Sequence, residues 1–83
     1  MKYTVEFKPR AIKDLKCIHR EDAARVLAAL KGLETNLAGD VKRLTDFTPE
    51  YRLRVGRYRV LFEIEDQERV VIYRIVHRRE AYR

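Results

Sequence analysis

The sequence predicts an α+β fold in which a two-helix hairpin packs on one face of a small, mainly antiparallel, four-stranded twisted sheet. The expected order is strand–helix–helix–strand–strand–strand, and strands grouped after helices are typical of this class. Apolar residues alternate at period two in the strand segments and recur at helical spacing between them. The chain has 83 residues, so we expect residues 1–83 to form one domain with a limited core.

The first strand and a short helix are expected at the start of the chain. Residues 2–7 alternate apolar and polar side chains, which indicates a strand. Pro9 ends this strand and suits the first turn of a helix, because that turn leaves its backbone N–H groups unpaired. The helix is predicted over residues 9–18. Its apolar face consists of Ala11, Ile12, Leu15 and Ile18.

A break near His19 leads to a longer helix, which is predicted over residues 21–37. Glu21 and Asp22 lie in its first turn, where negative charge complements the helix dipole. Gly39 is a natural stop for the helix. A continuous apolar stripe follows the helix and must be covered by the sheet. The stripe consists of Ala23, Val26, Leu27, Leu30, Leu33 and Leu37.

The next segment is predicted to be a loop followed by a β-hairpin. Residues 40–50 are polar and include a proline, which indicates the loop. Residues 51–55 and 58–65 alternate apolar and polar side chains. The pair Gly56-Arg57 between them suits a two-residue hairpin turn.

The last strand is predicted over residues 69–77, after a turn at Asp66-Gln67. Its near-continuous apolar character indicates burial on both faces. The strand at residues 2–7 must join the same sheet, because so short a strand is not stable alone.

The composition is that of a basic globular domain. The formal net charge is +6 and the pI is about 9.8, which favours binding to polyanions or to acidic proteins. No apolar run is long enough to span a membrane, and MKYTVEFKPR lacks the apolar centre of a secretion signal. The single cysteine, Cys17, rules out an internal disulfide and fits a reducing compartment. We therefore expect a cytoplasmic protein without membrane contact.

The most basic segment is YRLRVGRYRVL, residues 51–61, which contains four arginines and no acid. Strand alternation places its arginines opposite the face that the helices cover. Arginines in a row on a strand are more often a solvated face or an edge that deters aggregation. The arginines expected on this face are Arg52, Arg54, Arg59, Arg74 and Arg78.

The usual catalytic sets are weak or missing. The chain has no serine and no glycine-rich phosphate loop, and we expect neither a metal ion nor a cofactor. Cys17 and His19 could form a pair, but a buried packing role for Cys17 is favoured. Glu63 and Glu65 are expected to be salt-bridged surface acids. His77 could carry a proton, although strand parity favours core packing.

Arginine and tyrosine therefore remain as the residues that could act on a ligand. The planar guanidinium fork matches phosphate oxygens and can hold the extra charge of a phosphorane. With a pKa above about 12, arginine is a poor base. Tyrosine can stack on a nucleobase or take part in proton transfer. The residues alone support phosphate binding more strongly than catalysis.

The order of elements, the segment YRLRVGRYRVLFEI and the ending HRREAY resemble the RelE family of bacterial and archaeal toxins. The resemblance covers essentially the whole chain, and the hairpin and the tail together make it fairly specific. It implies the toxin of a type II toxin–antitoxin system, which enters the ribosomal A site on the small subunit, where it cleaves mRNA by metal-independent 2′-OH attack. It also implies a cognate acidic antitoxin as partner, and contact with operator DNA only through that antitoxin.

The resemblance also implies roles for single residues. Arg52 and Arg54 match positions, often lysine in the family, that bind phosphate and aid 2′-OH activation. Arg59 matches the arginine that contacts the scissile phosphate. Arg78, with Arg79 as the second choice, matches the arginine that stabilises or protonates the leaving group.

Further residues are expected to bind the RNA. Tyr82 matches the tyrosine that stacks on and orients the mRNA base, and it completes the catalytic set. Lys42 and Arg43 match basic residues that precede the hairpin and contact ribosomal RNA. The residues expected to bind RNA without entering the chemistry are Lys42, Arg43, Arg57, Arg74 and Arg79.

Alternatives remain for the residues and for the function. Arg57 could simply be exposed in its turn, and Arg74 could pair with Glu63 or Glu65. A ParE-like toxin that inhibits gyrase would share the fold, although such proteins typically lack the basic and tyrosine set. A non-catalytic basic module that binds RNA or an acidic protein is the third possibility.

Overall fold

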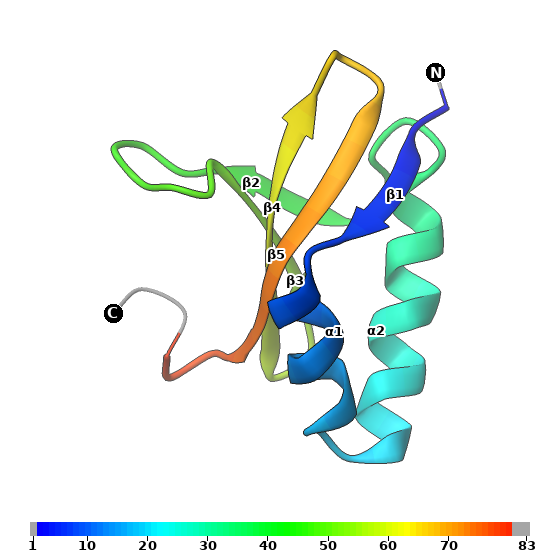
Figure 1. Cartoon of the computed structure of the whole chain (residues 1–83), viewed down its shortest axis with the longest axis vertical. Coiled ribbons are helices and arrows are strands. Elements are labelled where there is room, and N and C mark those ends of the chain that lie inside the picture. Colours follow the sequence, from blue (N-terminus) through cyan, green and yellow to red (C-terminus); the bar gives the residue numbers. More distant parts are fainter. Residues whose placement is uncertain (1, 81–83) are drawn as a thin grey trace.

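The computed structural model describes residues 2–80 and contains two helices and one mixed sheet. The elements are β1 (Thr4–Phe7), α1 (Pro9–Lys16), α2 (Arg20–Leu33), β2 (Asp40–Arg43), β3 (Tyr51–Val55), β4 (Tyr58–Glu65) and β5 (Arg69–His77). The strand order in the sheet is β1-β5-β4-β3-β2, and only the β1–β5 pair is parallel. Both helices lie on the same side of the sheet (Figure 1). The predicted α+β class and mainly antiparallel sheet are confirmed.

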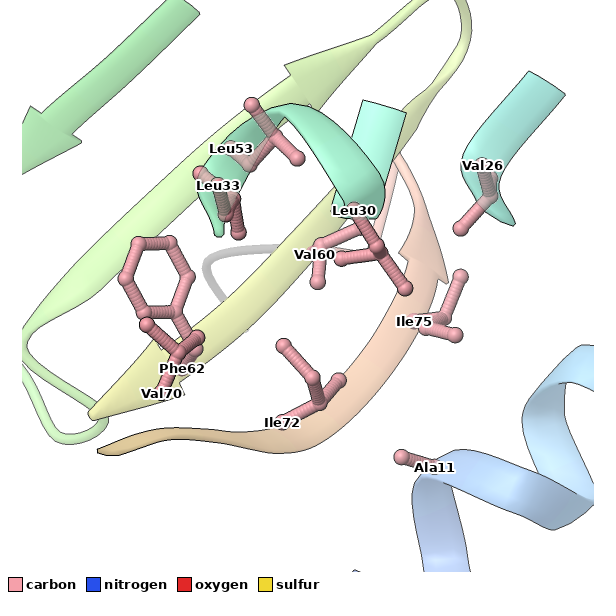
Figure 2. Packing of buried hydrophobic residues seen from close by; sticks show 10 residues of the cluster. All are labelled: Ala11, Val26, Leu30, Leu33, Leu53, Val60, Phe62, Val70, Ile72 and Ile75. Carbon is pink, nitrogen blue, oxygen red and sulfur yellow. The ribbon is translucent and has the colours of Figure 1, made fainter. Parts of the chain in front are cut away.

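The core lies between α2 and the sheet. Its side chains interdigitate from both layers, and Ala11 of α1 closes one side (Figure 2). Because strand residues alternate, burial of Leu53, Val60 and Phe62 fixes which face of β3 and β4 meets the helices. The core residues are Ala11, Val26, Leu30, Leu33, Leu53, Val60, Phe62, Val70, Ile72 and Ile75.

The junction between the two helices confirms the predicted break. The His19 side chain caps α2 by accepting a hydrogen bond from the Glu21 N–H at 3.2 Å. Cys17 is the C-terminal cap of α1 and is exposed. The prediction that Cys17 is a buried packing residue is wrong, because α1 ends at Lys16 and leaves Cys17 outside the helical face.

The second helix ends earlier than predicted. It stops at Leu33, where the backbone turns to pair with the start of the chain: Tyr3 N–H donates to Glu34 O at 2.8 Å. Asn36 and Leu37 then adopt positive φ angles of 54°. Gly39 is therefore not the helix stop. It has a φ of +127°, and a Cβ at this position would lie 2.9 Å from Leu53 Cδ1.

Gly39→Ala is expected to lower the free energy of unfolding by about 2–3 kcal/mol, because it adds backbone strain and a clash with a core side chain. Gly56→Ala is the matched control. Gly56 also has positive φ, but a Cβ there would meet no atom within 4 Å, so about 1 kcal/mol is expected. Urea unfolding measures both values. Equal losses would contradict the role assigned to the Gly39 contact.

Residues 40–50, predicted as a loop, contain a fifth strand. Residues 40–43 pair with β3 as the edge strand β2. The segment is short, polar and mostly exposed, so hydrophobic periodicity does not distinguish it from a loop. The rest of the segment projects from the sheet on the side away from the helices (Figure 1), and its residues Leu44 and Phe47 pack against Leu61 and Val76.

The last strand is buried on both faces, as predicted. Val70 and Ile72 face the core, while Val76 belongs to the small cluster on the opposite face. The pairing with β4 shifts between Leu61 and Phe62, which lie opposite Arg74 and Ile72. This irregularity leaves Tyr73 as the extra residue of β5.

Candidate nucleic-acid interface

The sheet face away from the helices carries the arginines of β3 and β4. Arg54 lies directly opposite Arg59, and Arg52 lies opposite Leu61. On the other neighbouring strand, β2, Lys42 lies directly opposite Arg52. Cross-strand partners share a face, and like charges directly opposite one another are destabilising. The Arg54–Arg59 pair is therefore an arrangement that a bound anion would stabilise.

These arginines differ in whether they already have an acidic partner. Arg52 is held by Asp40, with Nη1 at 3.0 Å from the backbone oxygen and 3.4 Å from Oδ1, and its side chain is only 12% exposed. Arg59 donates to Tyr58 O at 3.2 Å but has no ion pair within residues 2–80. Arg54 is exposed and likewise lacks an ion pair in this part of the chain. Arg54 and Arg59 are thus the strand residues available to an anion.

The hairpin turn and the end of β5 add two more arginines. The Arg78 N–H donates to Arg57 O at 2.7 Å, which fixes the residue after β5 beside the turn. Arg78 has the same strand parity as Val76, whose side chain lies on the arginine face. Arg79 lies in the turn after β5 and has no backbone hydrogen bond to the hairpin among those described; its N–H donates to His77 Nδ1 at 3.3 Å. Arg78 is therefore better placed than Arg79 to extend the arginine row.

We name these four residues, Arg54, Arg57, Arg59 and Arg78, the tip cluster. Within residues 2–80, no acidic side chain forms an ion pair with any of them. They surround the β3–β4 turn, whereas Leu44 and Phe47 cover the neighbouring apolar part of the same face. Arg54, Arg57 and Arg78 are exposed and Arg59 is half-buried, so the tip cluster is a cationic surface suited to a phosphate backbone.

The two basic residues before the hairpin lie on opposite faces of the sheet. Lys42 is exposed on the arginine face, opposite Arg52. Arg43 points by strand parity to the other face and pairs with Glu50 at 3.3 Å. Lys42 therefore adds a positive charge beside Arg52 and not beside the tip cluster, since the β2 residue opposite Arg54 is Asp40.

The predicted partners of Arg74 are wrong. Its guanidinium binds Asp14 of α1 at 2.7 Å, because α1 packs beside β5 and brings this carboxylate to the strand. Glu65 pairs with Arg69 at 3.1 Å, as expected of a surface acid. Glu63 instead accepts the Glu50 N–H at 2.7 Å. The Arg74 side chain, which is 37% exposed, therefore forms a structural ion pair between β5 and α1.

Asp14 fastens α1 to the strand that leads to Arg78. It accepts hydrogen bonds from Arg74 Nε and from the Ile75 N–H, the latter at 3.0 Å. Burial alone would raise the pKa of Asp14. These hydrogen bonds, with the positive charges of Arg74 and Arg10, outweigh burial and lower the pKa below the usual 3.8.

Asp14→Asn is expected to lower the free energy of unfolding near neutral pH by about 1–2 kcal/mol, since it removes a charge-assisted hydrogen bond partly screened by solvent. The folded-state pKa lies below the unfolded value. The stabilisation is therefore present above pH 4, approximately, and is lost as pH falls through the folded-state pKa. Denaturant unfolding from pH 2 to pH 8 measures it. A difference between the two proteins that stays constant down to pH 2 would contradict this account.

His77 packs on the helix side of the sheet, as strand parity predicted. Its ring meets the Tyr58 ring edge-on, with centroids 5.7 Å apart. Burial, followed by the charge and hydrogen bonding of Asp22, raises the pKa of Tyr58. Nδ1 of His77 accepts the Arg79 N–H, so His77 shapes the backbone that presents Arg78. Tyr82, predicted to stack on a base, lies outside the described residues.

The tip cluster is not set in an enclosed pocket. A cavity of about 570 Å³ is bounded by the segment from Arg43 to Glu50, at the end of β3 away from the hairpin turn, and no residue of the tip cluster lines it. Residues 2–80 contain no group of three or more His, Cys, Asp or Glu side chains that could hold a metal ion. Over the same residues, neither helix has the length and apolar character needed to cross a membrane. The geometry suits an extended polyanion held on an open surface.

Comparison with known proteins places this chain in a class of small toxins. A family model for the ParE toxin of the type II toxin–antitoxin system parDE matches residues 5–82. The putative toxin RelE1 of Methanocaldococcus jannaschii is 34% identical, covering 98% of this chain and 94% of that protein. The chain belongs to the RelE/ParE superfamily of type II toxin–antitoxin toxins.

Solved structures show the same fold. The RelBE2 toxin–antitoxin complex of Mycobacterium tuberculosis contains a chain with a TM-score of 0.78 and 31% identity, covering 93% of this chain and 99% of that chain. The RelE-RelB complex of Pyrococcus horikoshii gives a TM-score of 0.76 at 25% identity, covering 98% and 100%. The predicted RelE-like fold is thus confirmed.

Proposed function

We propose that this chain is a ribosome-dependent mRNA endonuclease that cleaves mRNA in the ribosomal A site by metal-independent attack of a 2′-OH on the adjacent phosphorus. The observation that carries the proposal is the tip cluster, four arginines without an acidic partner among residues 2–80. The similarity to RelE toxins supports this assignment. The open surface also supports it, since the ribosome would hold the mRNA in place.

The residues divide the chemistry between them. Arg54 and Arg59 hold the non-bridging oxygens and stabilise the negative charge that grows on the phosphorane. Arg78 approaches from the end of β5 and stabilises the departing 5′-oxygen. Arginine remains protonated and does not remove the 2′-OH proton, so we assign that step to a group outside the tip cluster. Arg52, already held by Asp40, positions the strand and the RNA backbone.

We also propose that an acidic antitoxin binds this chain and carries it to operator DNA. The related solved structures are toxin–antitoxin complexes. A groove of about 220 Å³ between β1 and α2 is lined in part by Val5, Phe7 and Leu30. Leu27 at its rim is 45% exposed, so an antitoxin helix could cover this stripe. Co-purification with the product of the adjacent reading frame tests the pairing, and an unchanged complex with Leu27→Glu would place the antitoxin elsewhere.

A gyrase-inhibiting function is the second candidate, because the matching family model is that of ParE toxins. The two functions damage different molecules. Primer extension on mRNA after induction separates them: cuts inside codons, found only on translated messages, support the endonuclease. Intact mRNA with DNA breaks would replace it with the gyrase toxin. Intact mRNA and DNA without growth arrest would leave a non-catalytic basic module.

A further inference from the structure

A second cavity lies on the opposite side of the hairpin turn from Arg54 and Arg59. It has a volume of about 380 Å³, within the range of about 300–1,000 Å³ typical of ligand pockets. It separates α2 from the β3–β4 turn. The residues lining it are Asp22, Arg25, Val55, Gly56, Arg57 and Tyr58.

The charges in this cavity favour an anion. Arg25 and Arg57 are both exposed, and neither forms an ion pair within the part of the chain that the structure describes. Asp22 is the one acid of the lining, so two guanidinium groups face one carboxylate there. By contrast, acidic side chains already pair with many other arginines of this protein, which are Arg10, Arg43, Arg52, Arg69 and Arg74.

The cavity is continuous with the tip cluster, because Arg57 belongs to both. Its backbone oxygen binds the Arg78 N–H, so the cationic surface runs from the end of β5 around the turn. Gly56 has no side chain at the turn, and a Cβ placed there would meet no atom within 4 Å. Position 56 therefore places no side chain between Arg57 and the mouth of the cavity that Arg25 also lines.

We propose that the cavity between α2 and the β3–β4 turn binds a phosphodiester of the same RNA strand that crosses the tip cluster, at a nucleotide beyond the cleaved bond. Arg25 and Arg57 grip this phosphate from either side. The site would keep the strand in register while Arg54 and Arg59 act on the scissile phosphate. The inference rests on the proposed function for its ligand, RNA, but it concerns binding and not cleavage.

Arg25→Gln tests the proposal, because Arg25 lies outside the tip cluster. The matched control is Arg20→Gln, which removes the same charge from an exposed position of the same helix. Binding of the purified proteins to single-stranded RNAs of about four and about twelve nucleotides is measured without ribosomes. For the longer RNA, Arg25→Gln should weaken binding about five- to tenfold and reduce the salt slope by about 0.7, the loss of one phosphate contact.

The short RNA, the Arg20→Gln control and the ribosomes complete the test. The short RNA should bind Arg25→Gln and the unmodified protein equally, and Arg20→Gln should change either affinity less than about twofold. Equal effects of the two variants on the longer RNA would overturn the site. If Arg25→Gln weakened binding to vacant small ribosomal subunits but not to single-stranded RNA, the ligand of the cavity would be ribosomal RNA, and the proposed path of the single strand would be overturned. If RNA binding follows the prediction but programmed ribosomes show no cleavage, the proposed function fails and this site remains.

Discussion

Arg59→Ala is expected to slow mRNA cleavage on programmed ribosomes by about 100-fold or more, the usual cost of losing a group that stabilises transition-state charge. Arg59 lies opposite Arg54 on the arginine face and has no acidic partner within residues 2–80. Its removal leaves no buried charge unpaired and relieves repulsion from Arg54. The free energy of unfolding should therefore change by less than about 1 kcal/mol.

Single-turnover cleavage and urea unfolding measure the two effects of Arg59→Ala. Arg20→Ala serves as the control, since Arg20 begins α2 on the other side of the sheet and is exposed. It should cleave within about twofold of the unmodified protein. Arg59→Lys should recover part of the rate, because it restores the charge but not the planar fork. Full toxicity of Arg59→Ala at matched expression would refute the site.

Arg78→Ala should also slow cleavage by about 100-fold, while Arg79→Ala should change it less than about fivefold. The two residues are adjacent but differ in placement. Arg78 shares parity with Val76 and is fixed beside Arg57 by its backbone hydrogen bond. Arg79 lies in the turn that follows β5, and its N–H donates to His77 Nδ1. Because Arg78→Ala and Arg79→Ala each remove one positive charge, a difference between their cleavage rates reports the position of the arginine.

The comparison of Arg78→Ala with Arg79→Ala needs two readouts. Cleavage rates on programmed ribosomes report the chemistry, and binding to the antitoxin reports that the surface is intact. Both variants should bind the antitoxin as the unmodified protein does. If Arg79→Ala were the slower enzyme, the backbone after His77 would present the other arginine, and the tip cluster would have to be redrawn.

Much of the fold follows from hydrophobic periodicity. The strands at residues 51–55, 58–65 and 69–77 match the structure because each alternates or is nearly continuously apolar and is bounded by a clear turn. Periodicity did not predict the elements whose presence or length is determined by tertiary contacts. The edge strand at residues 40–43 has few apolar side chains, and α2 ends where its backbone meets β1.

The site could be predicted in part for the same reason. Alternation places Arg52, Arg54 and Arg59 on one face, but it does not reveal which arginines already have partners. Arg52 is tied to Asp40 twelve residues earlier, and Arg74 is tied to Asp14 sixty residues earlier. These pairings depend on register and helix packing, which a sequence pattern does not encode. Because of these pairings, only the arginines of the tip cluster remain without an acidic partner on the arginine face within residues 2–80.

The packing of Leu44 and Phe47 over the sheet was also missed. The only sequence signal is two apolar residues in a polar segment, which is common in loops. In the structure they cover Leu61 and Val76 and restrict the exposed arginine surface to the region around the turn. In the proposed function, this covering would confine an RNA strand to the end of the hairpin where the four arginines lie.

The central claim is that the tip cluster promotes attack of a 2′-OH on a phosphate held in the ribosomal A site. The most direct test is a reconstituted cleavage reaction with the purified chain, ribosomes and an mRNA labelled at its 3′ end. We expect cleavage only on ribosomes, a labelled fragment with a 5′-OH, and no product when the A-site ribose next to the cut is replaced by deoxyribose. Cleavage of the deoxy-substituted mRNA, or none of the ribose mRNA on ribosomes, would contradict it.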